Sequence, residues 1–268
     1  MLKKSFQVLK NNPIIILFYG VYFVIMFLIL FTLYPHDLSQ FSTTNLEQFN
    51  FTEYIIMMIK MLTAAGLISV LGIVFFSGFG YMISEAVRTG KTSKNSLLQG
   101  IKKFILRTLV AALLLFTMTM GVSMIMSIIT IPITMWQVFT GGYSSVQYLS
   151  ILITAITAVI TIFLIPFILL WFPSIFMDDT KVIQALKSGA KAGVKNYWKL
   201  VLTLLVIYLP TGLIMGFNYG SIVNGSIFTP CFLVMYLIDA IISIFIIVLL
   251  FVIYEEYRVK NMPYYGQM

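Results

Sequence analysis

The fold is decided by the stretch Phe172-Pro173-Ser174-Ile175-Phe176-Met177-Asp178-Asp179-Thr180 and the lysine-rich segment that follows it. An apolar run is broken at Pro173, and two aspartates then predict the start of a new helix. Their side chains can accept hydrogen bonds from the amides of its first turn, and their charge suits the positive end of the helix dipole. We therefore expect Asp178 and Asp179 to cap a helix over about 180–196.

This predicted helix has an apolar and a basic face. Apolar residues recur at helical spacing: Ile183, Leu186, Ala190, Val194 and Tyr197. Lysines share the opposite face: Lys187, Lys191 and Lys195. A basic amphipathic helix of this kind lies in a membrane interface with its lysines toward anionic head groups, and Trp198 would sit at head-group depth. The alternative is a solvated cytoplasmic helix, which we favour less because an apolar run follows at once.

The composition is that of an integral membrane protein. Of the 268 residues, 60% are hydrophobic and only 10% are charged, whereas soluble domains carry roughly 25% charged residues. The net charge of +8 is explained by the positive-inside bias and by anionic lipid, so we expect no nucleic-acid partner. The single cysteine, Cys231, excludes an intrachain disulfide and a multi-cysteine metal site.

Six apolar runs are long enough to cross a bilayer as helices. They cover about 13–34, 54–83, 104–130, 149–172, 200–217 and 231–254. We therefore expect an all-α integral membrane bundle of six transmembrane helices, forming one domain over residues 1–268. The first run is too long for the core of a signal peptide. The uncharged segment from Ile131 to Tyr148, with Pro132 and Trp136, is interpreted as an outer turn.

The basic residues predict the orientation of the chain. Of the 17 lysines and arginines, 16 fall in the N-terminal segment, in 88–107, in 181–199 or in the C-terminal tail, and Lys60 is the exception. Six spans place all four of these segments on one side, which the positive-inside rule makes cytoplasmic. We therefore expect a multi-pass plasma-membrane protein with both termini in the cytoplasm.

Three short basic segments precede the first, third and fifth predicted spans. They are Ser5–Lys10, Ser96–Lys103 and Ala185–Lys191. One interpretation is three repeated helical hairpins, each with a basic interfacial amphipathic helix. The other is that basic flanks simply precede spans that run from inside to outside.

A family resemblance rests on Phe172-Pro173, Asp178-Asp179, the segment 182–188, Tyr197-Trp198-Lys199 and the late Tyr254-x-x-Tyr257-Arg258. These residues resemble those of bacterial six-helix membrane proteins, typified by the membrane domain of glycerophosphoryl diester phosphodiesterase and related families of unknown function. The resemblance implies a fold and a membrane location. The phosphodiesterase proteins carry a separate soluble catalytic domain, which this chain could not supply, so the resemblance does not imply hydrolysis.

Residues that could carry chemistry are few. His36 beside Asp37 makes no credible metal site, since structural zinc needs four ligands. The sequence contains no phosphate-binding glycine loop, nucleophile elbow or His-Glu zinc motif. We therefore expect no enzyme activity, no metal and no cofactor.

Asp239 is the acidic residue placed well inside a predicted span. A charge at that depth is expensive, so such residues usually face the bundle or a cavity. Asp239 is either a proton or cation site, or a neutral residue that fixes helix packing through a hydrogen bond, for instance to Thr203 or Tyr208. We favour the structural role because no second intramembrane charge pairs with it.

The leading interpretation is a non-enzymatic membrane protein. It would act through its interfacial helices on anionic lipid or on a membrane protein partner, in envelope maintenance or protection against membrane stress. The alternative is a small transporter or permease that uses Asp239 and the helices interrupted by Pro166 and Pro210, because broken helices are a transporter feature.

Overall fold

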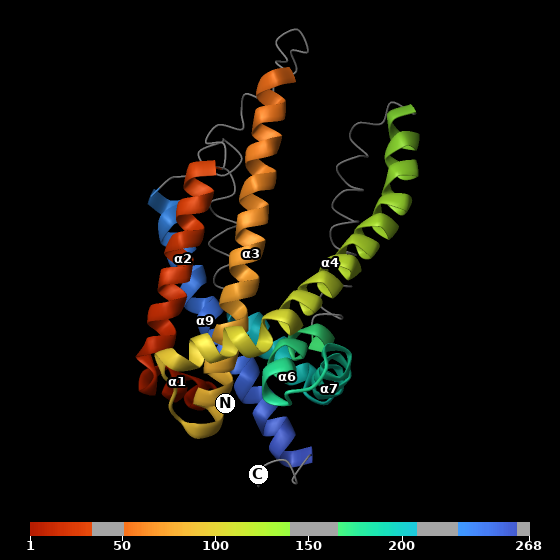
Figure 1. Cartoon of the computed structure of the whole chain (residues 1–268). Helices are drawn as coiled ribbons and strands as arrows, with labels where there is room; N and C mark the ends of the chain where they lie inside the picture. The colour runs from red at the N-terminus through yellow and green to blue at the C-terminus, as the bar shows by residue number, and fades with distance from the viewer. Residues whose placement is uncertain (34–50, 140–165, 208–229, 262–268) are drawn as a thin grey trace. The chain divides into compact units, whose positions relative to one another are not determined.

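The computed structural model describes residues 1–33, 51–139, 166–207 and 230–261, and this part of the chain is all α-helical (Figure 1). Its helices are α1 (Leu2–Asn11), α2 (Pro13–Leu33), α3 (Phe51–Thr89), α4 (Lys94–Phe139), α6 (Trp171–Met177), α7 (Val182–Lys195) and α9 (Pro230–Asn261). Two shorter apolar helices are Pro166–Met177, which contains α6, and Tyr197–Ile207.

Four helices in the described residues are long and apolar enough to cross a membrane. Their spanning segments are Pro13–Leu33, Ile55–Thr89, Lys94–Met124 and Tyr236–Asn261. Much of their apolar surface is exposed: Leu17 on α2, Leu62 on α3 and Met124 on α4 are each more than 60% exposed. Since lipid tails are as apolar as these side chains, such a surface is stable in a bilayer and unstable in water. The chain is therefore a helical, multi-pass membrane protein.

The chain divides into two compact units. The first contains Met1–Ile105 and Leu202–Met268, and the second contains Leu106–Val201. The first unit holds α1, α2, α3, the start of α4 and α9. The second holds the rest of α4 together with α6 and α7.

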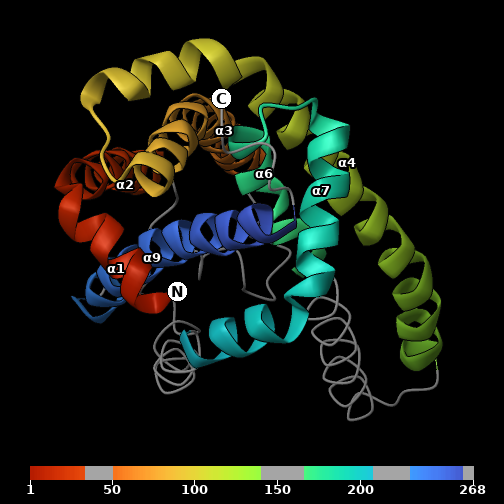
Figure 2. The same cartoon turned by 90° about the horizontal axis from the view of Figure 1, so that it is seen from below.

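The core of the first unit is built around α9, which lies against α1, α2 and α3 (Figure 2). Val248, Phe251, Val252 and Tyr254 of α9 are fully buried. Close to its end, the Arg258 Nε lies 3.5 Å from the Glu255 Oε2, and both side chains are largely shielded from solvent. The C-terminal part of α9 therefore packs as a core helix rather than facing lipid on all sides.

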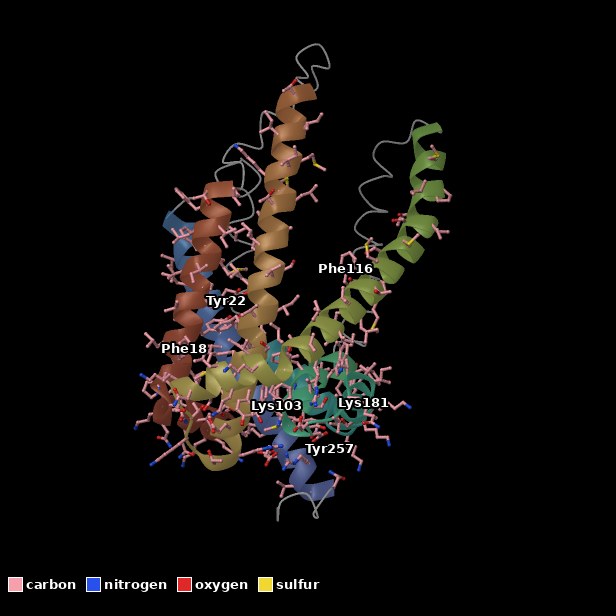
Figure 3. The ribbon with its side chains drawn as sticks, viewed as in Figure 1. Phe18, Tyr22, Lys103, Phe116, Lys181 and Tyr257 are labelled. Atoms are coloured by element: carbon pink, nitrogen blue, oxygen red, sulfur yellow. The ribbon has the colours of Figure 1, made fainter. Side chains whose placement is uncertain are left out.

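Aromatic rings join α2 to α3. The Tyr22 ring stacks on Phe75 with centroids 4.2 Å apart, and Tyr19 lies 5.5 Å from Phe79. Figure 3 shows Tyr22 on the side of α2 that faces α3. A Cβ built on Gly72 would stand 3.5 Å from the Tyr22 hydroxyl, an ordinary contact distance. Such pairs add to the burial of apolar area.

Part of the predicted outer turn was wrong. The segment 131–139 was expected to be part of an outer turn, but α4 continues through Pro132 to Phe139. Between the described helices α3 and α4, the turn comprises only residues 90–93, and the basic residues on either side of it are helical. Hydropathy marks the part of a helix that suits lipid, and helical backbone can continue beyond that part into the interface.

The count of six spans is not shown. The predicted spans 149–172 and 200–217 lie largely outside the described residues, and their described parts, 166–172 and 200–207, belong to the two shorter apolar helices. The basic segments also differ from one another. α1 and α7 are separate helices, whereas Ser96–Lys103 is continuous with the long helix α4.

Candidate functional site

The candidate site is α7, which is fixed in place by α6 within the second unit. The Trp171 Nε1 donates a hydrogen bond of 3.0 Å to the Val182 carbonyl oxygen. The Ser174 Oγ lies 2.7 Å from the carbonyl oxygens of Trp171 and Ala185, and its proton can bond to either. Trp171 and Ser174 are buried. Because buried polar groups are costly unless paired, these bonds favour one position of α7 against α6.

Small residues allow the two helices to approach closely. The buried residues of α7 are Val182, Ala185, Gly189, Ala192 and Gly193. A Cβ on Gly189 would lie 2.7 Å from the backbone of Trp171, and one on Gly193 would lie 2.1 Å from the Pro166 carbonyl oxygen. Backbone contacts this close need residues without a Cβ, as in other tightly packed membrane helices.

α7 therefore presents two further sectors to its surroundings. One is apolar: Ile183 is 62% exposed and Val194 is 56% exposed, with Leu186 and Ala190 half-buried between them. The other carries the predicted lysines Lys187, Lys191 and Lys195, all exposed. Trp198, one turn beyond α7, is 71% exposed. The amphipathic pattern predicted from the sequence is thus present, but the sequence did not reveal the third, buried sector of small residues.

The predicted cap of α7 was wrong. The N-cap residue is Lys181, which is labelled in Figure 3 and makes no side-chain capping hydrogen bond. Asp178 is instead the C-cap of α6, where its N–H bonds to the Ser174 carbonyl oxygen at 3.0 Å. The two aspartates lie ahead of α7 because a short connection, 178–181, separates it from α6.

Asp179 has a different role from the one predicted. It adopts a positive φ of 53°, a conformation that Asp tolerates better than most residues. Its carboxylate accepts a hydrogen bond of 2.5 Å from the Arg107 guanidinium of α4. Both side chains are more than 30% exposed, so the pair contributes modestly to stability. Its effect is to connect the α6–α7 turn to α4 within the second unit.

Asp239 belongs to the first unit, on α9. Its electrostatic neighbours include Tyr19 of α2 and Tyr236 of α9, and the Tyr19 hydroxyl has a hydrogen-bonding partner in Ser243 of α9. Of the partners predicted for Asp239, Tyr208 lies outside the described residues, while α2 supplies a neighbour that was not predicted. Asp239 thus lies in a polar patch between α2 and α9.

A second polar cluster, at the turn between α3 and α4, was not predicted. The Glu85 carboxylate accepts a hydrogen bond from the Thr92 hydroxyl at 2.7 Å and another from the Ser96 hydroxyl. The buried Asn12 donates to the Gly90 carbonyl oxygen at 3.1 Å and accepts from the Thr92 N–H at 2.8 Å. The run Thr92-Ser93-Lys94-Asn95-Ser96 signals a helix start, but its partner Asn12 is 80 residues away from Thr92 in the sequence.

The described residues contain no group of three or more His, Cys, Asp or Glu side chains that could hold a metal ion. His36 lies outside them.

Comparison with known proteins places the whole chain in one family. Residues 1–261 match DUF7847, described as a domain of unknown function. Neither curated proteins nor solved structures gave a match. The match covers all the helices described above, including α7, the Asp239 patch and the Glu85 cluster. This multi-pass membrane protein therefore belongs to the DUF7847 family.

Proposed function

We propose that this chain is a non-enzymatic protein of the bacterial plasma membrane that acts at the cytoplasmic face on anionic lipid or on a membrane partner. The observation that carries the proposal is the surface of α7, where an exposed apolar sector with Ile183 and Val194 adjoins exposed lysines. An apolar stripe beside a basic one suits the boundary between acyl chains and anionic head groups.

The attachment of α7 to α6 supports this role. A free amphipathic helix must order itself on the membrane, whereas α7 is already folded by Trp171, Ser174 and its two glycines. Preorganisation lowers the entropic cost of binding. The proposed biological role, maintenance of the envelope or protection from membrane stress, needs a protein that senses or holds the inner leaflet. The resemblance to the membrane domain of glycerophosphoryl diester phosphodiesterase fits the same location.

The test compares two double variants of the full-length protein with the same net charge. Lys187→Gln/Lys191→Gln removes charge from α7, and the control Lys91→Gln/Lys260→Gln removes it from exposed positions elsewhere. Each protein is purified in nanodiscs that contain phosphatidylglycerol and phosphatidylcholine, and the retained lipids are measured by native mass spectrometry.

We expect the α7 variant to lose anionic lipid by about fivefold per lysine at low salt, since each contributes on the order of 1 kcal/mol. The difference should shrink at high salt, because exposed charges are screened. An equal loss in the control would mean that any lysine near the surface suffices, and α7 would lose its special role. Failure of the α7 variant to complement a deletion strain would link lipid binding to the cellular function.

The transporter alternative is favoured by one observation, the gathering of Asp239, Tyr19 and Ser243 between α2 and α9. Polar side chains inside spanning helices commonly mark a substrate or proton path. Uptake assays on proteoliposomes with an imposed proton gradient, comparing the native chain with Asp239→Asn, would distinguish this function from the first.

A further inference from the structure

Three segments of the chain share one surface pattern. They are α1, residues 94–105 at the start of α4, and α7, and we refer to them as the three interfacial segments. Each has a buried sector that packs on a neighbouring helix, an apolar sector that is partly or fully exposed, and an exposed polar sector rich in lysine.

In α1 the buried sector consists of Ser5, Val8 and Leu9, and this helix packs on α9. Two large apolar side chains remain exposed, Leu2 at 54% and Phe6 at 62%. The basic sector carries Lys3, Lys4 and Lys10, all exposed. Exposed apolar side chains next to three lysines suit a membrane interface, where the former meet acyl chains and the latter meet head groups.

At the start of α4 the buried sector consists of Ser96, Gly100 and Phe104. Leu98 is 60% exposed, and Leu97, Ile101 and Ile105 beside it are half-buried. The polar sector is formed by Asn95, Gln99, Lys102 and Lys103, all exposed. The third segment, α7, has the sectors described above.

The rotational order of the sectors is the same in all three segments. We follow each helix in the direction of the chain, at about 100° per residue. The buried sector is then followed by the apolar sector and next by the basic sector. A helix with three sectors has only two such orders. In each segment the buried sector packs on a neighbouring helix. Because the order is shared, the apolar sector then lies on the same side of all three segments when each is viewed from its N-terminal to its C-terminal end.

Local contacts repeat as well. When Ser96–Lys103 is aligned with Ala185–Lys191 from their first residues, Gly100 pairs with Gly189. A Cβ on Gly100 would lie 2.6 Å from the Tyr81 Cβ of α3. Each glycine thus packs on the helix that precedes its segment. Asn12 and Asn196 end α1 and α7, and each side-chain amide donates to the carbonyl oxygen four residues earlier, at 2.9 and 3.0 Å. The glycine contacts relate the start of α4 to α7 and support the interpretation of the basic segments as an internal repeat. The asparagine bond is also made by Asn261 of α9, so it is not specific to these segments.

We propose that the three interfacial segments form equivalent docking sites for anionic phospholipid in one leaflet. Their apolar sectors insert at the boundary of head groups and acyl chains, and their lysines bind the phosphate groups. The inference rests on the proposed function of α7 and extends it to α1 and the start of α4. The occupant is a lipid surface because each segment joins an apolar helix at its C-terminal end, which holds the segment at the bilayer surface.

The depth of the apolar sectors is the first test. Single cysteines are introduced as Phe6→Cys, Leu98→Cys and Ile183→Cys in a Cys231→Ser background. They are labelled with an environment-sensitive nitrobenzoxadiazole dye in full-length protein reconstituted into vesicles with acyl-brominated phosphatidylglycerol. Matched controls lie in the basic sectors: Lys10→Cys, Lys102→Cys and Lys191→Cys. Buried apolar faces of interfacial helices lie about 5–10 Å into the boundary, so labels there should be quenched about twofold more than the controls.

The lysines of α1 are the second test. Lys3→Gln/Lys10→Gln should reduce retained phosphatidylglycerol by about fivefold per lysine at low salt, compared with Lys91→Gln/Lys260→Gln. Should Phe6→Cys fail to fold, Leu2→Cys reports on the same sector.

The outcomes separate this inference from the proposed function. Quenching at Ile183→Cys without quenching at Phe6→Cys and Leu98→Cys would overturn the three-site proposal and leave α7 as the lipid-binding helix. Quenching at none of the three positions would overturn both. Quenching at all three with unchanged lipid retention in the α1 variant would overturn the proposal that anionic head groups are recognised.

Discussion

At the scale of single residues, Gly193 shows how strongly one missing side chain can determine the packing of α7. Its backbone lies so close to Pro166 that a Cβ would stand 2.1 Å from the carbonyl oxygen. No side chain can yield there, since the obstacle is backbone. By contrast, a Cβ on Gly66 of α3 would meet nothing within 4 Å. The two glycines look alike in the sequence, yet only Gly193 stands where a Cβ cannot fit.

Gly193→Ala should therefore lower the free energy of unfolding by about 1–3 kcal/mol, the usual range for overpacking. The control Gly66→Ala should leave it unchanged or raise it by up to about 1 kcal/mol, because alanine is the better helix former. Thermal unfolding in detergent, followed by circular dichroism, measures both. Equal melting temperatures for the two variants would contradict the close approach of α7 to Pro166.

Asp239 poses a different question, whether its charge or only its hydrogen-bonding capacity is needed. As a structural residue, it can be replaced by Asn without loss of stability or of complementation. Asp239→Leu should then lower stability by about 1–3 kcal/mol, since its polar neighbours lose a partner. A double-mutant cycle with Tyr19→Phe tests whether the coupling runs between α9 and α2, because residues that interact give non-additive effects. A stable Asp239→Asn protein that fails to complement would instead favour the transporter.

At the scale of helices, Asn12 links the junction between α1 and α2 to the turn between α3 and α4, far away in sequence. It lies between α1 and α2, yet its side chain bonds to Gly90 and to Thr92 in the turn between α3 and α4. The same turn is held from α3 by Glu85. Gly90 has a φ of +83°, which a glycine adopts without strain. The N-terminal end of α2 and the C-terminal end of α3 are thus fixed side by side.

Asn12→Ala should leave the Gly90 carbonyl and the Thr92 N–H without their partner, at a cost of about 1–3 kcal/mol for buried groups. The neighbouring Asn11 is exposed, so Asn11→Ala is the matched control and should change little. Hydrogen exchange followed by mass spectrometry would show faster exchange in the turn 90–93 in the Asn12 variant alone. Identical exchange in both variants would rule out this connection.

These helices also show how much the sequence could predict. The apolar runs located α2, α3, α4 and α9, because bilayer thickness demands about 20 apolar residues. The lysines of α7 and its exposed apolar sector followed from helical spacing. The buried sector did not, since Ala185, Gly189 and Ala192 carry little hydropathy contrast. The Asn12 contacts could not be predicted either, because Asn12 meets a turn about eighty residues away.

At the scale of the whole molecule, the basic residues of the first unit lie close together at one of its ends. In the first unit, Asn12 holds the N-terminal helix, with its three lysines, against the basic turn between α3 and α4. Figure 1 shows the C-terminal part of α9, whose last turn carries Arg258 and Lys260, at that same end. Two basic segments, α1 and the turn between α3 and α4, therefore lie at one end of this unit, and the last turns of α9 add Arg258 and Lys260 beside Glu255 and Glu256.

The orientation of that end can be tested by cysteine labelling in intact cells. In a Cys231→Ser background, Ser93→Cys and Lys187→Cys should resist a membrane-impermeant thiol reagent, because both exposed positions belong to basic segments that the positive-inside rule places in the cytoplasm. Cysteines at Ser39, Tyr143 and Ser221, in segments poor in basic residues, should label. Permeabilised cells provide the control, since all five positions should then react. Labelling of Lys187→Cys in intact cells would place α7 outside, where its lysines would face no anionic cytoplasmic leaflet, and would exclude the proposed lipid docking.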